Sequence, residues 1–261
     1  MRGPEPRDLV ATLAPSEAAL LKREPGTLVW RETRADGARV VAKLYRRRSR
    51  LTFLRSKVTR FRAEREFRRL RHLHRAGIPC TEPLGWAEGS SREHGFHELL
   101  LMREVPDAVP LDEVLREQGA AVQLAPLYRV VRRMHESGFC HQTLYAANVL
   151  LSRSAPPGAE FFLSDVPRSW TFPRSLVGTR LALWDLLDLE VTIGRAGGRV
   201  GPEALAAYGL DDATAERRAR EIGRDSTTKW RRLLRDLAAR GRWIGAWSAF
   251  WKGRGAVAES R

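Results

Sequence analysis

Short hydrophobic runs dominate the first hundred positions of the chain and predict β-strands. Residues 27–32 and 39–45 are rich in β-forming side chains and flank the turn sequence Ala35-Asp36-Gly37. They predict a hairpin in which Lys43 lies near the end of the second strand. Two further strands are predicted at residues 84–87 and 97–102. This part of the chain therefore indicates a small antiparallel sheet.

Helical spacing appears in the stretch between these strands and again after residue 110. One helix is predicted by the recurring apolar positions Phe61, Phe67, Leu70 and Leu73, and Gly77-Ile78-Pro79 ends it. The later elements are predicted as two amphipathic helices at residues 111–118 and 124–137 and two short strands at residues 148–151 and 161–163. The remainder of the chain is expected to be mostly helical.

An α+β fold with two lobes accounts for this order of elements. Residues 1–105 are expected to form an N-terminal lobe of antiparallel sheet with one helix, and residues 106–261 a mainly helical C-terminal lobe. A short hinge is expected at residues 103–110, where the pattern changes from strand to helix. With 261 residues, the chain is long enough for one large domain or two packed lobes.

The net charge of the chain indicates which kinds of partner it is suited to bind. Forty-six Lys and Arg against 31 Asp and Glu give a formal net charge of +15 and a pI near 11.0. This balance favours an anionic partner such as nucleic acid, an anionic membrane leaflet or a phosphorylated substrate. No apolar run approaches the ~18 residues of a membrane span, and the first residues lack the pattern of a secretory signal. We expect a cytoplasmic protein, either free or peripheral on the inner face of the cytoplasmic membrane.

The first two candidates for chemistry are a strand lysine and a helix glutamate. Lys43 closes the run Val40-Val41-Ala42-Lys43, although a lysine at a strand end is usually only a solvated edge charge. Glu64 and Glu66 are the only acids between residues 60 and 75, and pairing with neighbouring arginines is the simplest role for either. The helical period places Glu66 one turn before Leu70, so Glu66 rather than Glu64 is expected to reach Lys43.

Two further candidate motifs flank the short strands of the second half. The segment from His141 to Asn148 reads His-Gln-Thr-Leu-Tyr-Ala-Ala-Asn and lies between an amphipathic helix and an apolar strand. Asp165 follows the strand at residues 161–163, where an aspartate on its own is most often a turn residue. Mg²⁺ takes oxygen ligands, commonly one or two carboxylates with phosphate and water. Asn148 and Asp165 would together supply such a set.

The joint order of these motifs resembles that of the protein kinases. His141, Leu144 and Asn148 match the catalytic-loop pattern His-Arg-Asp-Leu-x-x-x-Asn in identity and spacing. The pattern Asp-x-x-Arg from Asp165 to Arg168 is similar to the bacterial lipopolysaccharide core kinases that phosphorylate heptose or Kdo. Further features similar to that family are Leu144-Tyr145, Gly77-Ile78-Pro79 and residues 180–186. The resemblance covers roughly residues 26–189.

This resemblance implies an ATP-dependent phosphotransferase of the protein-kinase fold, with Mg²⁺ as cofactor and a sugar hydroxyl as acceptor. It implies that Lys43 neutralises the α- and β-phosphates of ATP while Glu66 holds Lys43 in place. The catalytic loop and metal site would comprise His141 as a structural support, Thr143 at the base position, and Asn148 and Asp165 as metal ligands. The other implied nucleotide contacts are Gly26, Met102 and Glu104. Asp185 would brace the catalytic loop from a helix of the C-terminal lobe.

Two departures from the kinase pattern stand out. The segment expected to cover the nucleotide, residues 23–29, has a single glycine, Gly26, where protein kinases carry three. Thr143 stands where the catalytic aspartate belongs, and a hydroxyl cannot accept a proton near neutral pH as a carboxylate does. Three readings stay open: a slow kinase, a kinase that recruits another carboxylate, or a nucleotide-binding pseudokinase that acts as a scaffold or regulator.

Two basic regions suggest where an anionic partner binds. Residues 46–75 contain thirteen Lys and Arg residues against two acids, a density that suits an anionic glycolipid, a lipopolysaccharide core sugar or lipid headgroups. Near the C-terminus, Trp243, Trp247 and Trp251 share one face of a basic helical segment, which suits either a membrane interface or, slightly favoured, docking on the C-terminal lobe. Nucleic acid is the least favoured partner, because the sequence contains no recognisable nucleic-acid motif.

Overall fold

The computed structural model describes residues 20–34, 36–46, 61–91 and 95–211. The chain divides into two compact units after Asp211, and all the described residues belong to the first unit. Residues 47–60, which hold six of the thirteen basic residues of the run at residues 46–75, lie outside the described residues, as does the whole tryptophan-rich segment with Trp243, Trp247 and Trp251. Within the described part, no helix is long and apolar enough to cross a bilayer.

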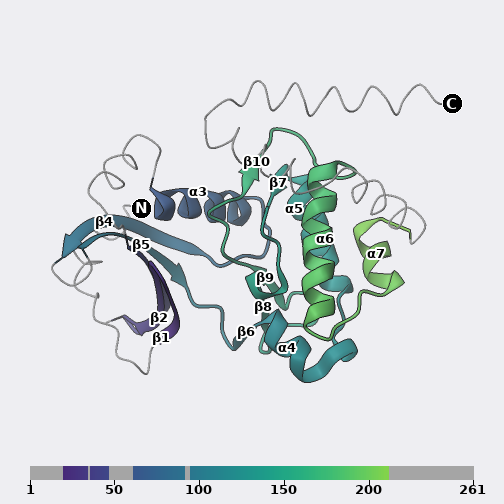
Figure 1. The fold of residues 1–261 in the computed structure, drawn as a ribbon, viewed down its shortest axis with the longest axis horizontal. Coiled ribbons are helices and arrows are strands. Elements are labelled where there is room, and N and C mark those ends of the chain that lie inside the picture. Colours follow the sequence, from purple (N-terminus) through teal and green to yellow (C-terminus); the bar gives the residue numbers. More distant parts are fainter. Residues whose placement is uncertain (1–19, 35, 47–60, 92–94, 212–261) are drawn as a thin grey trace. The chain divides into compact units, whose positions relative to one another are not determined.

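The first half of the described chain forms a five-stranded antiparallel sheet (Figure 1). In spatial order its strands are β1 (Leu20–Glu24), β2 (Thr27–Thr33), β3 (Arg39–Arg46), β5 (Gly95–Arg103) and β4 (Pro83–Ser91). The predicted hairpin is β2–β3, and its register sets Val29 opposite Lys43. Strand β1 was not predicted, because its sequence Leu-Leu-Lys-Arg-Glu is that of a mostly exposed edge strand without hydrophobic alternation.

One helix, α3 (Arg62–Arg75), packs along this sheet, as the apolar spacing predicts (Figure 1). Its buried positions, Ala63, Glu66, Leu70 and Leu73, recur every three or four residues and so form a single face. The helix ends where Gly77 adopts a φ of +67°, a left-handed conformation that costs glycine little. A carboxylate, Glu66, therefore lies within the apolar face that α3 turns toward the strands.

The second half is mainly helical, with short strands between the helices. Its helices are α4 (Leu111–Gln118), α5 (Ala125–Glu136), α6 (Arg180–Arg195) and α7 (Pro202–Tyr208), with short 3₁₀ turns η2 (Gly119–Ala121) and η3 (Ala146–Asn148). Its strands are β6 (Ala108–Pro110), β7 (Phe139–Cys140), β8 (Val149–Ser152), β9 (Phe161–Leu163) and β10 (Trp170–Thr171). The α+β, protein-kinase-like fold class is confirmed, whereas the boundary between residues 105 and 106 stays a prediction.

The expected hinge at residues 103–110 is partly structured. Strand β6 pairs antiparallel with β8, so that Ala108 lies opposite Ser152. Its sequence, Ala-Val-Pro, is too short and too proline-rich to show a strand pattern, and tertiary pairing decides its conformation. The hydroxyl of Ser152 also donates to the carbonyl of Pro106 at 2.6 Å. The connection between sheet and helices is thereby tied to β8.

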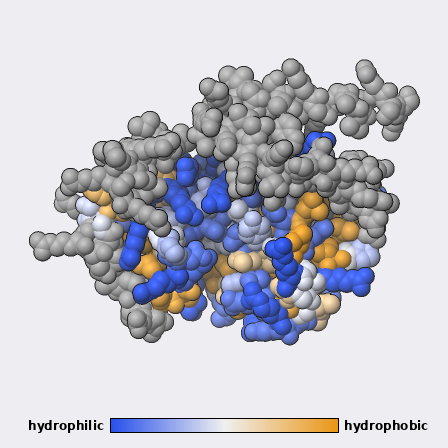
Figure 2. Space-filling model, viewed as in Figure 1, coloured by the Kyte–Doolittle hydropathy of each residue, from blue (hydrophilic) through white to orange (hydrophobic). Residues whose placement is uncertain are grey.

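Apolar packing continues from the sheet into the helical half. One cluster of buried side chains includes Tyr45 and Leu100 of the sheet, Leu70 of α3, Met134 of α5 and Leu186 of α6. The visible face in Figure 2 is hydrophilic over much of its middle, and hydrophobic residues gather over α6 and α7. Backbone hydrogen bonds also join the sheet half to the helical half. The amide of Leu163 in β9 donates to the carbonyl of Pro79, between α3 and β4, at 3.0 Å.

Gly138, between α5 and β7, shows where the backbone permits no side chain. Its φ is +77°, and a Cβ there would collide with the carbonyl oxygen of Phe172 and lie 2.8 Å from that of Arg174. We expect Gly138→Ala to lower the free energy of unfolding by ~2–4 kcal/mol, from left-handed strain and overpacking together. Urea denaturation measures the change.

Gly158 is the matched control for this substitution. Its φ is +87°, yet a Cβ there would meet no heavy atom within 4 Å. Gly158→Ala should therefore carry only the backbone strain, about 1 kcal/mol. Equal losses in the two variants would show that the collision of the added methyl group with residues 172–174 does not contribute to the destabilisation in Gly138→Ala.

Candidate active site

A buried cluster of charges joins β3, α3 and the segment after β9. The ammonium of Lys43 lies 3.0 Å and 3.2 Å from the two carboxylate oxygens of Glu66 and 2.5 Å from Oδ1 of Asp165. Burial lowers the pKa of Lys43, but the two carboxylates more than offset burial, and the pKa stays above its ordinary value. The lysine is therefore a fixed positive charge at neutral pH.

The predicted choice of Glu66 over Glu64 is confirmed as a contact. Glu66 is fully buried and faces Lys43, whereas Glu64 pairs with Arg68 one turn along α3 at 2.8 Å. The helical period accounts for the difference, because positions 64 and 66 point about 200° apart around the axis. The sequence pattern thus identified which acid reaches the sheet.

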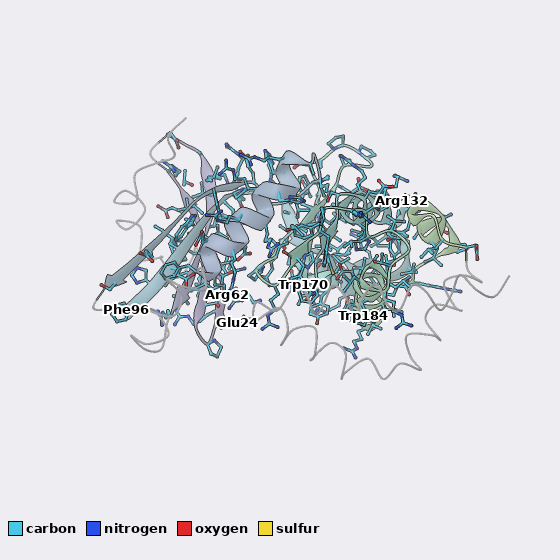
Figure 3. All side chains as sticks on the ribbon, turned by 90° about the horizontal axis from the view of Figure 1, so that it is seen from above. Glu24, Arg62, Phe96, Arg132, Trp170 and Trp184 are labelled. Carbon is cyan, nitrogen blue, oxygen red and sulfur yellow. The ribbon has the colours of Figure 1, made fainter. Side chains whose placement is uncertain are left out.

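Tyr45 belongs to the same cluster and was not singled out from the sequence. Its hydroxyl donates to Glu66 Oε2, and the guanidinium of Arg62 lies 4.4 Å from the centre of its ring. Arg62 is at the start of α3 (Figure 3). Two-residue alternation along β3 places Tyr45 on the same face as Lys43, and this signal could have identified it.

The segment from His141 to Asn148 forms a loop whose backbone is held by Asp185 of α6. The carboxylate accepts hydrogen bonds from the amide of His141 at 2.6 Å and from the amide of Gln142 at 2.7 Å. Gln142 has a φ of +67°, an uncommon conformation for this residue type. The brace that the family resemblance implied for Asp185 is present, and it holds the strained residue directly before Thr143.

His141 connects this loop to the residue before Asp165. Its ring is fully buried, and Nε2 donates to the carbonyl of Ser164 at 3.0 Å. Burial lowers the pKa of His141, so the ring is neutral at neutral pH. With the proton on Nε2, Nδ1 is an acceptor and faces the hydroxyl of Thr143 at 3.5 Å. Thr143 thus lies beside a neutral imidazole, and its role at the base position stays a prediction.

Asn148 and Asp165 lie at the same end of one strand pair. Strands β8 and β9 are antiparallel, with Val149 opposite Leu163, so the residues just outside them are neighbours. The side-chain amide of Asn148 donates to the carbonyl of Thr143 at 2.8 Å, so its side-chain oxygen is the atom that would face a metal ion. Asp165 has a φ of +54°, and Lys43 overcomes the effect of burial to lower its pKa.

This pair of oxygen donors fits Mg²⁺, which commonly takes one or two carboxylates and completes its shell with phosphate and water. The part of the chain that the structure describes contains no group of three or more His, Cys, Asp or Glu placed to hold a metal ion. The donors suit a metal that arrives with a phosphorylated ligand.

The remaining predicted nucleotide contacts lie in three different places on the sheet: a turn, an inner strand and the end of that strand. Gly26 forms the turn between β1 and β2 with a φ of +87°, and its carbonyl accepts from the amide of Arg46 at 2.9 Å. Met102 is buried in β5. The carboxylate of Glu104 pairs with Arg39 at 2.6 Å and also with Arg31. Their roles toward a nucleotide stay predictions.

Comparison with known proteins is consistent with this geometry. Residues 22–190 match the model of the lipopolysaccharide kinase (Kdo/WaaP) family. A 3-deoxy-D-manno-octulosonic acid kinase from Actinobacillus succinogenes is 31% identical over 107 residues, which cover 41% of this chain and 44% of that protein. The same enzyme from Mannheimia succiniciproducens is 27% identical over 112 residues, 42% of this chain and 46% of that protein.

These matches span less than half the length of the two curated relatives. Among solved structures, WaaP in complex with acyl carrier protein has a TM-score of 0.53 at 21% identity, covering 91% of this chain and 92% of that chain. At this level of identity the likeness concerns the fold. It covers more of the chain than the family-matched residues do.

The buried charge cluster can be tested by a matched pair of substitutions on α3. Glu66→Gln removes a fully buried charge that faces Lys43, and we expect the free energy of unfolding to fall by ~3 kcal/mol. Glu64→Gln removes a charge that pairs with exposed Arg68, and its effect should stay below ~0.5 kcal/mol. Chemical denaturation of both variants decides, and similar losses would contradict the assignment of Glu66.

Proposed function

The chain belongs to the lipopolysaccharide kinase (Kdo/WaaP) family, and on this premise we propose that it transfers the γ-phosphate of ATP to a hydroxyl of a lipopolysaccharide core sugar. The observation that carries the proposal is the convergence of Lys43, Asn148 and Asp165 from three separate elements. We further propose a cytoplasmic location for this reaction, at the inner face of the cytoplasmic membrane, where an anionic glycolipid would meet the basic chain.

The charges of the site suit the electrostatic demands of phosphoryl transfer. The reaction passes through a loose transition state and depends mainly on positioning and charge neutralisation. Lys43 is a permanent cation, since Glu66 and Asp165 keep it protonated, and it would bind the α- and β-phosphates. Asn148 and Asp165 would hold Mg²⁺, which supplies further positive charge at the phosphate oxygens when bound. His141 and Asp185 keep the loop between these groups in place.

A pseudokinase that binds nucleotide without transferring phosphate is the second candidate, and Thr143 is the observation that favours it. The hydroxyl of Thr143 faces Nδ1 of His141 at 3.5 Å, so it has a neutral imidazole rather than a carboxylate beside it. A general base typically contributes ~10²–10⁴-fold to a proton-transfer step. Because phosphoryl transfer depends less on a base than most reactions, the parent chain is expected to be slow rather than inactive.

Nucleotide binding tests the site itself. We expect Asp165→Asn to weaken binding of Mg-ATP roughly 10- to 100-fold, because one charged ligand of the metal is lost. Asp112→Asn, which removes a charge paired with Arg116 on α4, is the matched control and should leave the affinity unchanged. Isothermal titration of the parent and both variants measures the effect. Parent-like affinity in Asp165→Asn would contradict the proposed metal site.

Single-turnover transfer to purified core oligosaccharide tests the reaction and the role of Thr143. We expect a measurable but slow parental rate and a clear gain in Thr143→Asp, because the loop that would hold the new carboxylate is already braced by Asp185. Nucleotide binding without transfer in both proteins would favour the pseudokinase. A parent as fast as Thr143→Asp would show that another carboxylate already serves the acceptor, since two nearby carboxylates oppose each other's ionisation.

A further inference from the structure

A chain of buried hydrogen bonds joins the last described helix to the candidate catalytic loop. The hydroxyl of Tyr208 on α7 lies 2.8 Å from Nδ1 of His135 on α5. On the other side of the ring, Nε2 of His135 lies 3.2 Å from Oδ2 of Asp185 on α6. Tyr208, His135 and Asp185 are 2%, 0% and 1% exposed, so bulk water cannot take the place of these partners.

The positions of the protons in this chain follow from the carboxylate. Asp185 accepts two loop amides, and hydrogen bonds from His135 and His141 overcome the effect of burial to lower its pKa. An ionised carboxylate only accepts, so Nε2 of His135 must carry a proton. In a neutral ring Nδ1 is then an acceptor. In that form of the ring, the hydroxyl of Tyr208 donates to Nδ1.

We propose that Tyr208 is a positioning residue for the catalytic loop, because its hydroxyl satisfies Nδ1 of His135 in the tautomer that donates to Asp185. In the opposite tautomer a lone pair of Nε2 would face the carboxylate across 3.2 Å. Asp185 would then lose its contact with Nε2 of His135 and keep only the amide donors of His141 and Gln142. The loop residue with the left-handed backbone, Gln142, depends most on this support.

Hydrogen bonds at the end of α7 hold Tyr208 next to His135. Nη1 of Arg132 donates to the carbonyl of Tyr208 at 2.6 Å, and Nε of the same guanidinium pairs with Glu136 at 2.8 Å. Arg132 lies beside α7 in Figure 3, and Gly209, with a φ of +87°, ends the helix next to it. Tyr208 lies outside the family-matched residues 22–190. The hydrogen bond from Tyr208 to His135 therefore comes from a part of the chain that the family match does not cover.

The tautomer of His135 can be measured in the unsubstituted full chain. Long-range ¹H–¹⁵N correlation should show the proton on Nε2 and an unprotonated Nδ1. A ring protonated on Nδ1 alone, or on both nitrogens, would overturn the proposal without any variant having to fold. In Tyr208→Phe the donor to Nδ1 is lost, and the Nε2-protonated form should no longer be the only one observed.

Hydrogen–deuterium exchange reports whether the loop depends on this tautomer. The amides of His141 and Gln142 should exchange about tenfold faster in Tyr208→Phe, the size expected for one weakened hydrogen bond. Tyr128→Phe is the matched control: Tyr128 is also buried, on the same helix as His135, but its hydroxyl lies beside Glu190. Its loop amides should exchange as in the parent. Equal acceleration in both variants, or none in Tyr208→Phe, would overturn the proposal.

Phosphate transfer provides a third readout, and it alone rests on the proposed function. We expect kcat to fall in Tyr208→Phe while KM for ATP is unchanged, because the loop, rather than Lys43 and the sheet, is disturbed. A change in KM with constant kcat would contradict a positioning role. If the parent itself transfers no phosphate, the proposed function fails, and the exchange and tautomer measurements still decide the role of Tyr208.

Discussion

The buried ammonium of Lys43 is the constraint around which the site is built. An ammonium taken out of water needs carboxylates within bonding distance, and the chain provides them from two different elements. Glu66 fixes the rotation of α3 about its axis, since no other position of the helix brings a carboxylate to β3. Asp165 draws the segment after β9 to the same point. The ammonium of Lys43 thus holds three parts of the chain together: strand β3, helix α3 and the segment after β9.

The loop around Thr143 keeps a complete supporting frame although its expected base is absent. Asp185 holds two consecutive amides, His141 bonds to Ser164, and Asn148 bonds back to the carbonyl of Thr143. Strained backbone such as that of Gln142 persists only where its surroundings fix it. The retention of this frame favours a site that still works by positioning and charge, which are the main sources of rate in phosphoryl transfer.

Local patterns in the sequence predicted the elements that bury a regular apolar face. The β2–β3 hairpin, α3, α4 and α5 all follow from periodicity, and Glu66 could be chosen over Glu64 for the same reason. Strands β6, β7 and β10 were missed because they are short and exist only through pairing with distant residues. Strand β1 was missed because it is a mostly exposed edge strand. Tyr208 was missed for a related reason, since its partner His135 lies 73 positions away.

The pairing of β8 with β9 makes the geometry of the proposed metal site independent of the chain that connects the two strands. Register, rather than residues 153–160, sets Asn148 beside Asp165, and the connection is closed at its base where the amide of Ser152 donates to Glu160 at 2.8 Å. Lengthening such a connection costs only about 0.6 kcal/mol for each doubling. Near Gly158, where a Cβ would meet no heavy atom within 4 Å, we therefore expect an inserted segment to leave the relative placement of Asn148 and Asp165 unchanged.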